Sequence, residues 1–187
     1  MNDKYGKGYF LIANPVLPDP NFSRTVILLC NHNDQGSFGL VLNRSTKLKA
    51  REVFTTHELF KEENNRVFFG GPVSQSQVFY LCRSENSIPG LEEICPDVYL
   101  GMNWESLEMT VDRLKEPEVN IQFYLGYSGW AAGQLDGEME QKSWLTCKAS
   151  EDFVFGVSEN QIWSMVVRSL GKNFEYLLQA PVNPNMN

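Results

Sequence analysis

The sequence predicts an α+β fold, a single compact domain with a coiled, mostly antiparallel or mixed β-sheet and several packed helices. Three observations favour it. Short apolar runs typical of strands come in groups of two or three, segments with helical spacing separate these groups, and strands and helices do not alternate as in a doubly wound sheet. The length of 187 residues suits one domain. We expect it to span 1–187, with an ordered core at about 8–178 and flexible ends at 1–7 and 181–187.

The composition narrows the class of protein. With 42% hydrophobic residues and a net charge of -7, the chain is typical of a globular protein that anionic membranes and nucleic-acid backbones repel. No apolar run is long enough for a signal segment or a membrane helix. The four cysteines form no Cys-x-x-Cys pair, which favours reduced, structural thiols. We therefore expect a cytoplasmic protein without a metal or cofactor.

The first half of the chain predicts mostly strands. Tyr9–Ala13 is a short apolar run followed by prolines, among which no helix can persist. The uninterrupted run at 25–30 predicts a strand covered on both faces, and 36–42 returns beside it through a polar turn. Apolar residues at helical spacing predict an amphipathic helix at about 50–61. Strands at 66–70 and 77–81 follow, joined by a Gly- and Pro-containing turn.

The second half predicts three helices. After a looser segment at 83–96 and a strand at 98–101, a helical stripe runs from Trp104 to Leu114 with Asn103 as N-cap. Strands are expected at 120–126 and 143–148, on either side of the second helix. A capping box at Ser158 opens the last helix, which stops at Gly171. A short packed turn is expected at 174–178.

The segment Gly126–Trp130 is the centre of the predicted fold. A strand ends there at a glycine-flanked turn, and a helix is expected to begin at Trp130. The glycine spacing matches neither the dinucleotide fingerprint nor a P-loop, which favours close packing over phosphate binding. Trp130, Gln134 and Glu138 share neighbouring turns of that helix. The stripe would either line a cleft or pack beneath a strand.

Two further groups of polar residues are weaker candidates. His32 follows a strand, and a Ser-His-Asp set can be drawn from Ser23, His32 and Asp34, although no nucleophile elbow accompanies it. Cys30 and His32 have the spacing of two zinc ligands, but a structural zinc site needs four. A basic cluster follows the third strand, at Arg44, Lys47, Lys49 and Arg51. The net charge of -7 argues against nucleic acid as a partner except through this cluster.

The sequence resembles the YqgE/AlgH family of small bacterial proteins over about residues 8–178. The resemblance rests on Asp19–Phe22, His32 with Gly36, Gly39 through Asn43-Arg44, Gly70–Val73, Gly126–Trp130, Gly133–Leu135 with Glu138, and Trp144-Leu145. It implies a compact α+β domain around a strongly coiled sheet, no settled activity, and a name taken from a member described as a regulator of transcription. Cys82 stands where relatives often have histidine, which puts a catalytic or metal role there in doubt.

The leading hypothesis is a non-catalytic, cytoplasmic binding or regulatory protein, because the sequence assembles no acid, base or metal constellation. Its partner would be a small ligand or another protein. The alternative is a small-molecule or nucleotide-processing hydrolase that uses Glu138 or His32 as acid or base. Both would use one candidate cleft, formed by Tyr127, Trp130, Gln134, Glu138, Asn43, Arg44 and His32.

Overall fold

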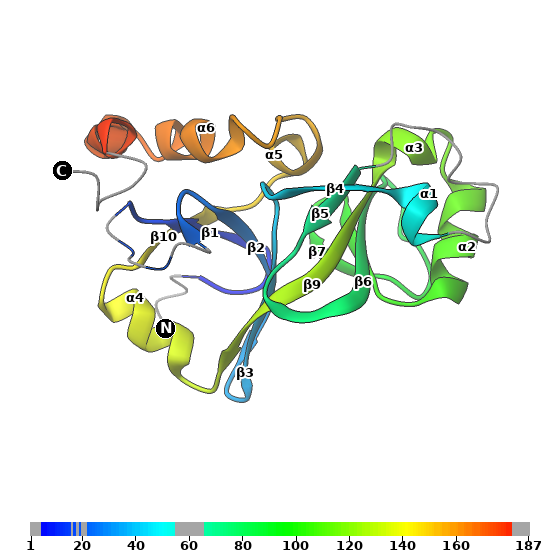
Figure 1. Ribbon diagram of the computed structural model, residues 1–187, viewed down its shortest axis with the longest axis horizontal. Helices are drawn as coiled ribbons and strands as arrows, with labels where there is room; N and C mark the ends of the chain where they lie inside the picture. The colour runs from blue at the N-terminus through cyan, green and yellow to red at the C-terminus, as the bar shows by residue number, and fades with distance from the viewer. Residues whose placement is uncertain (1–4, 16, 18, 20–21, 55–65, 181–187) are drawn as a thin grey trace.

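The computed structural model describes residues 5–15, 17, 19, 22–54 and 66–180, and within them it has the expected α+β fold (Figure 1). The strands are β1 (Tyr9–Ala13), β2 (Val26–Asn33), β3 (Gly36–Val41), β4 (Ser45–Lys49), β5 (Arg66–Phe69), β6 (Val73–Arg83), β7 (Glu92–Cys95), β8 (Val98–Gly101), β9 (Ile121–Ala131) and β10 (Trp144–Lys148). The helices are α1 (Ala50–Val53), α2 (Trp104–Arg113), α3 (Pro117–Asn120), α4 (Gln134–Glu140), α5 (Glu151–Phe155), α6 (Ile162–Ser169) and the 3-10 helix η3 (Lys172–Gln179).

The sheet is mostly antiparallel, in the order β10-β1-β2-β3-β9-β6-β8-β7, with β5 parallel to β9 and β4 antiparallel to β5. Strand β9 joins its two halves. Its first residues pair with β5 and β6, and its last residues pair with β3. In Figure 1 it crosses the molecule between the half that holds β1, β2 and β10 and the half that holds β6 and α2. The coiled, mixed sheet predicted from the sequence is confirmed.

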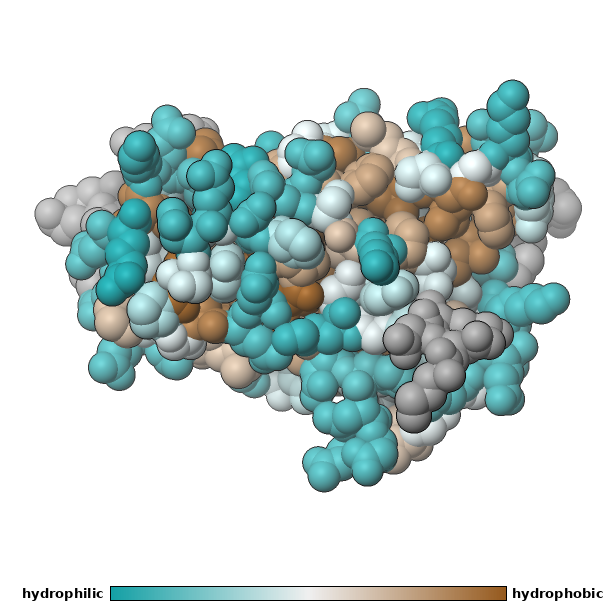
Figure 2. Space-filling model, turned by 180° about the vertical axis from the view of Figure 1, so that it is seen from behind, coloured by the Kyte–Doolittle hydropathy of each residue, from teal (hydrophilic) through white to brown (hydrophobic). Residues whose placement is uncertain are grey.

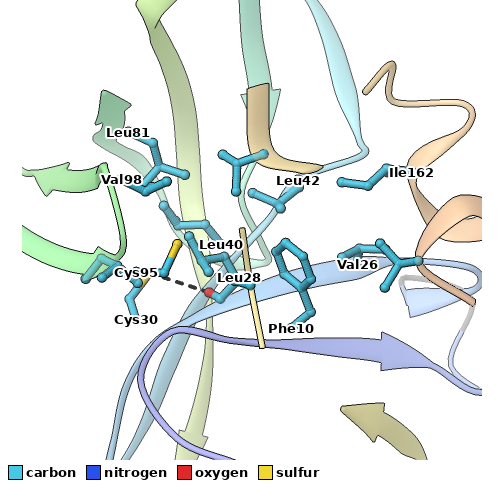
Figure 3. Packing of buried hydrophobic residues seen from close by; sticks show 14 of the residues in the cluster. Phe10, Val26, Leu28, Cys30, Leu40, Leu42, Leu81, Cys95, Val98 and Ile162 are labelled. Atoms are coloured by element: carbon cyan, nitrogen blue, oxygen red, sulfur yellow. Dashed lines mark hydrogen bonds between the residues drawn. The ribbon is translucent and has the colours of Figure 1, made fainter. Parts of the chain in front are cut away.

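Apolar side chains cover both faces of the β1–β2–β3 half. On the outside of the molecule, hydrophilic residues take up much of the face that Figure 2 shows. Leu28 of β2 belongs to the largest core cluster, which also contains Val166 of α6, whereas Leu29 belongs to a separate cluster with Leu135 of α4. Figure 3 shows Phe10, Leu28 and Leu40 meeting in the larger cluster, with Ile162 approaching from the helical layer. Because side chains of a strand alternate between faces, a strand buried on both sides is apolar throughout. This is why 26–30 reads as an unbroken apolar run.

The predicted turn at Gly126–Trp130, with a helix starting at Trp130, is wrong. Strand β9 continues to Ala131, and α4 begins only at Gln134, after Gly133 with φ of 72°. Gly126 has φ of 67°, and a Cβ there would lie 2.6 Å from the carbonyl oxygen of Gly71. The glycine therefore lets β9 pass close to the start of β6. It does not end the strand.

Other elements differ from the sequence prediction in smaller ways. Strands β4 and β7 and helices α3 and α5 were not expected, and β6 begins within the predicted 71–75 turn. The predicted helix at 50–61 begins with α1, but residues 55–61 lie outside the described part of the chain. Residues 1–4 and 181–187 also lie outside the described part of the chain, and they include most of the predicted flexible ends. The N-cap at Asn103 is confirmed, since its side chain accepts a hydrogen bond from the Ser106 amide at 2.8 Å.

The four cysteines are free thiols: Cys30, Cys82 and Cys95 are buried, and Cys147 is half-buried. Burial raises the pKa of Cys82 and Cys95 from 9.0 to about 12 and that of Cys147 to about 11. It also raises the pKa of Cys30, whose sulfur donates to the Leu28 carbonyl in Figure 3. No helix in the described residues is long and apolar enough to cross a membrane.

Candidate functional site

Glu138 lies at the centre of a hydrogen-bond network that attaches α4 to the sheet. Its Oε2 atom accepts the indole N–H of Trp130 at 2.9 Å and that of Trp144 at 2.8 Å. Its Oε1 atom accepts the Gln134 amide at 3.0 Å. The Gln134 oxygen in turn accepts the backbone N–H of Ala131 at 3.1 Å. Both carboxylate oxygens therefore have donors from the fold itself, and the stripe packs against the sheet.

His32 lies on the same face as α4 and contacts a serine and an aspartate. Its Nδ1 atom is 2.7 Å from the Ser37 hydroxyl, and its Nε2 atom is 3.7 Å from Oδ1 of Asp136. The Tyr5 hydroxyl donates to the same Asp136 oxygen, and the Tyr5 and His32 rings lie 5.1 Å apart. Burial, followed by this hydrogen bond and the nearby carboxylates, raises the pKa of Tyr5 to about 12. This set of residues is called the His32 cluster below.

The partners of His32 differ from those that the sequence suggested. The serine and the aspartate that contact His32 are Ser37 and Asp136, whereas the sequence had suggested Ser23 and Asp34. Ser37 was within reach of sequence reasoning, because the predicted hairpin pairs Asn33 with Gly36 and so sets His32 opposite Ser37. Asp136 could not be found in this way, since its position depends on where α4 begins. The cluster has the components of a general base and its orienting carboxylate, but Ser37 is only 8% exposed.

Asn43 and Arg44 follow the opposite end of β3 from the hairpin. The Asn43 side chain accepts the Val26 amide at 2.9 Å and donates to the Arg24 carbonyl at 2.8 Å. The Arg44 guanidinium donates to the Ser23 carbonyl, and burial lowers the pKa of Arg44. These contacts fix the loop before β2 against the end of β3. Among the described residues, neither side chain forms a hydrogen bond or ion pair with the stripe on α4.

Tyr127 points away from that stripe. It belongs with the larger core cluster, where its ring packs edge-on against Phe38 at 5.4 Å and Phe79 at 5.7 Å. Above this aromatic group lies a surface hollow of about 430 Å³, between the β2–β3 turn and β9. Its walls include Asn31, Asn33, Gln35, Phe38, Val73 and Tyr127, and no charged residue lines it. We call it the hairpin hollow.

The structure therefore divides the predicted cleft. The side chains of Trp130, Gln134, Glu138 and His32 lie on the α4 side of the sheet, and the Tyr127 ring lies on the other side. Ser37 and Trp130 also line the hairpin hollow beside Tyr127. Sequence reasoning missed Trp144, Tyr5 and the amide side chains of the hairpin. The hairpin amides carried a signal, because three of the residues from Asn31 to Gln35 have amide side chains. No group of three or more His, Cys, Asp or Glu side chains suited to a metal occurs within the described residues.

Comparison with other proteins identifies relatives over almost the whole chain. The family model described as AlgH-like matches residues 10–175. A protein of Cytophaga hutchinsonii, named only as a UPF0301 protein, is 36% identical over 182 residues, covering 97% of this chain and 98% of the relative. A UPF0301 protein of Chlorobium luteolum is 37% identical over 180 residues, covering 96% and 94%.

Two solved structures share the fold. The solution structure of the AlgH protein from Pseudomonas aeruginosa has a TM-score of 0.75 and 31% identity, covering 97% of this chain and 96% of that one. A crystal structure of a Corynebacterium diphtheriae protein has a TM-score of 0.79 over 92% of this chain and 91% of that one, and its 20% identity supports the fold alone. From the match of the family model and of relatives along almost its entire length, the chain belongs to the AlgH-like family.

Proposed function

We propose that this protein is a non-catalytic, cytoplasmic binding protein whose ligand is an uncharged polar molecule held in the hairpin hollow. One observation carries the proposal. The chain has 16 basic and 23 acidic residues, yet none of them lines this hollow. Its volume of about 430 Å³ is in the range of small-molecule sites, roughly 300 to 1,000 Å³. The free thiols support a reducing, cytoplasmic setting.

The side chains of the hollow suit a ligand rich in hydroxyl or amide groups. An amide side chain offers two donors and an acceptor, and only part of this capacity is used within the hairpin. Asn33 accepts the Gln35 backbone amide at 2.9 Å, while the Gln35 side chain has no hydrogen-bond partner among the described residues. The rings of Phe38 and Tyr127 supply an apolar floor. Aromatic floors with amide walls bind neutral polar ligands such as sugars, nucleosides and polar peptide segments.

A thermal-shift screen of neutral saccharides, nucleosides and uncharged peptides tests the proposal. A ligand present at a hundred times its Kd stabilises the folded state by ~2.7 kcal/mol. In a chain of 187 residues we expect this to raise the Tm by roughly 5 to 10 °C. Asn31 is exposed and lines the hollow, so Asn31→Asp places a charge there and should weaken binding at least tenfold.

The exposed Asn86 on another loop provides the matched control. Asn86→Asp makes the same change of charge outside the hollow and should leave the ligand-induced shift intact. The proposal fails if a ligand's shift survives Asn31→Asp unchanged, or if only charged ligands produce a shift.

The His32 cluster favours one second candidate, a hydrolase with Ser37 as nucleophile and His32 as base. Low exposure of Ser37 argues against it, and Glu138 is occupied by indole donors. We expect no ester turnover and no labelling by a serine-reactive phosphonate probe. Labelling of the wild type that disappears in Ser37→Ala, with a ~10²-fold or greater loss of turnover in folded His32→Gln, would establish the hydrolase instead.

A further inference from the structure

A second, polar hollow lies between the β4–β5 pair and the loop that precedes α6. Its volume is about 390 Å³, and its lining includes Lys47, Lys49, Arg66, Glu159 and Asn160. It shares no lining residue with the hairpin hollow. We call it the basic groove. Figure 1 shows β4 running along β5 on the side of the sheet where α5 lies.

The basic groove concentrates positive charge on an acidic protein. Three cationic side chains and one carboxylate line it, a formal charge of +2, whereas the whole chain carries -7. Lys47 and Lys49 form no ion pair with any residue of the described ranges. Arg66 contacts Glu159 only at 3.8 Å, with the arginine side chain 58% exposed. Because the arginine is exposed and the two atoms are far apart, the pair contributes little stability, and Arg66 remains available to a ligand together with the two lysines.

The strand register sets like charges against each other in this groove. Lys49 is the antiparallel partner of Arg66, and β4 has β5 as its one strand partner among the described residues. Like charges directly opposite on neighbouring strands destabilise the pair. A dianion between the two side chains would replace this repulsion with attraction. This placement of like charges favours an anion between the two side chains, whereas a purely structural role would favour an ion pair at these positions.

The donors match a phosphate group. Lysine offers three N–H donors and arginine a planar set suited to phosphate oxygens. The Asn160 amide has no hydrogen-bond partner among the described residues and adds two neutral donors. A phosphate monoester carries about -1.5 to -2 charges at pH 7, which balances the +2 of the lining. The groove has room for more than one phosphate, since it falls in the size range of small-molecule sites.

We propose that the basic groove binds a small, soluble phosphate monoester, with Lys47, Lys49 and Arg66 around the phosphate. Isothermal titration calorimetry with glucose 6-phosphate, inorganic phosphate and glucose tests this. We expect glucose 6-phosphate to bind, inorganic phosphate to bind more weakly, and glucose not to bind. Binding should weaken between about 20 and 200 mM salt, because screening reduces charge attraction at exposed sites.

Removing a positive charge from the basic groove should weaken binding of glucose 6-phosphate, and removing its negative charge should strengthen it. Lys47→Gln and Lys49→Gln should each weaken binding of glucose 6-phosphate at least fivefold. Glu159→Gln removes the single carboxylate of the lining and should strengthen it several-fold. Lys148→Gln and Lys172→Gln make the same charge change at exposed sites on β10 and η3 and should leave it unchanged. Because Lys49 is opposite Arg66, Lys49→Gln removes a repulsion and should leave the Tm unchanged or raise it. A Tm in this range would show that the variant is folded.

Several outcomes would overturn the assignment. One is the absence of any binding of glucose 6-phosphate at low salt. Equal losses in the groove variants and in the two control variants would mean that only overall charge matters. Tighter binding of inorganic phosphate than of the ester would exclude a site for the whole molecule. Tighter binding of a single-stranded oligonucleotide than of glucose 6-phosphate would make the groove a nucleic-acid surface instead.

Discussion

Replacing Glu138 with alanine is expected to lower the free energy of unfolding by about 3 to 5 kcal/mol, which for a chain of this size lowers the Tm by about 6 to 20 °C. The carboxylate accepts the indole N–H groups of Trp130 and Trp144, which are 7% and 3% exposed. Removing it leaves two donors without an acceptor in a site with little access to water. Each such donor costs about 1 to 3 kcal/mol. Urea unfolding followed by tryptophan fluorescence measures the effect.

Two variants test whether the loss of stability comes from the missing acceptor. Glu138→Gln keeps one oxygen that can accept both indoles, so we expect a loss of only about 1 to 2 kcal/mol. Glu140→Ala removes an exposed carboxylate from the same helix and should change stability by less than about 0.5 kcal/mol. A Glu138→Ala protein as stable as the wild type would show that the indoles find other acceptors. The network would then contribute little to holding α4.

Raising the pH from 9 to 11 is expected to unfold the protein. The pKa values of Cys82 and Cys95 are about 12 and that of Cys147 about 11, while an unfolded thiol titrates near 9.0. Between these values the unfolded chain has released protons that the folded chain retains, so the free energy of unfolding falls as pH rises. Below pH 9 the contribution is fully present. Each thiol loses up to about 1.4 kcal/mol per pH unit.

The summed effect is comparable with the whole stability of a domain. Four thiols with raised pKa values, including Cys30, lose on the order of 10 kcal/mol between pH 9 and 11, against a typical 5 to 15 kcal/mol. Circular dichroism at stepped pH under reducing conditions follows the transition. Cys147→Ala removes the most accessible of these thiols and should move the midpoint to higher pH. A free energy of unfolding that stays constant from pH 9 to 11 would contradict the prediction.

The sequence predicted those structural features that are determined by residues close to one another in the chain. The strand at 25–30 covered on both faces, the turn at 33–36 and the cap at Asn103 were each predicted from residues close in sequence, and each appears in the structure. The turn predicted at Gly126 failed because the reason for that glycine lies elsewhere. It makes room for the backbone of Gly71, which is distant in sequence. From a single sequence, a glycine required because two backbone segments pass close together cannot be distinguished from a glycine required by a turn.

The site was harder to predict for the same reason. The stripe of Trp130, Gln134 and Glu138 was identified, with both a cleft and packing beneath a strand as interpretations. The partner that favours packing, Trp144, comes from another strand. Lys47 and Lys49 were recognised as a basic cluster, but the opposing Arg66 and the loop at Asn160 became visible only with the strand register. A site whose residues come from strands and loops far apart in the chain cannot be predicted from any one segment of the sequence.

The position of β9 also has a consequence for synthesis. This strand comes after residue 120, yet β3, β5 and β6 all pair with it. As the chain leaves the ribosome, each of these three strands can pair with one neighbour that emerges before β9, namely β2, β4 or β8, but its other edge keeps unpaired N–H and C=O groups until residues 121–131 emerge. Such edges are the usual starting points of aggregation, and non-local pairing slows folding. We expect nascent chains truncated before residue 121 to aggregate unless chaperones bind them. Once β9 has emerged and paired with β3, β5 and β6, these strand edges are covered and the tendency to self-associate should fall.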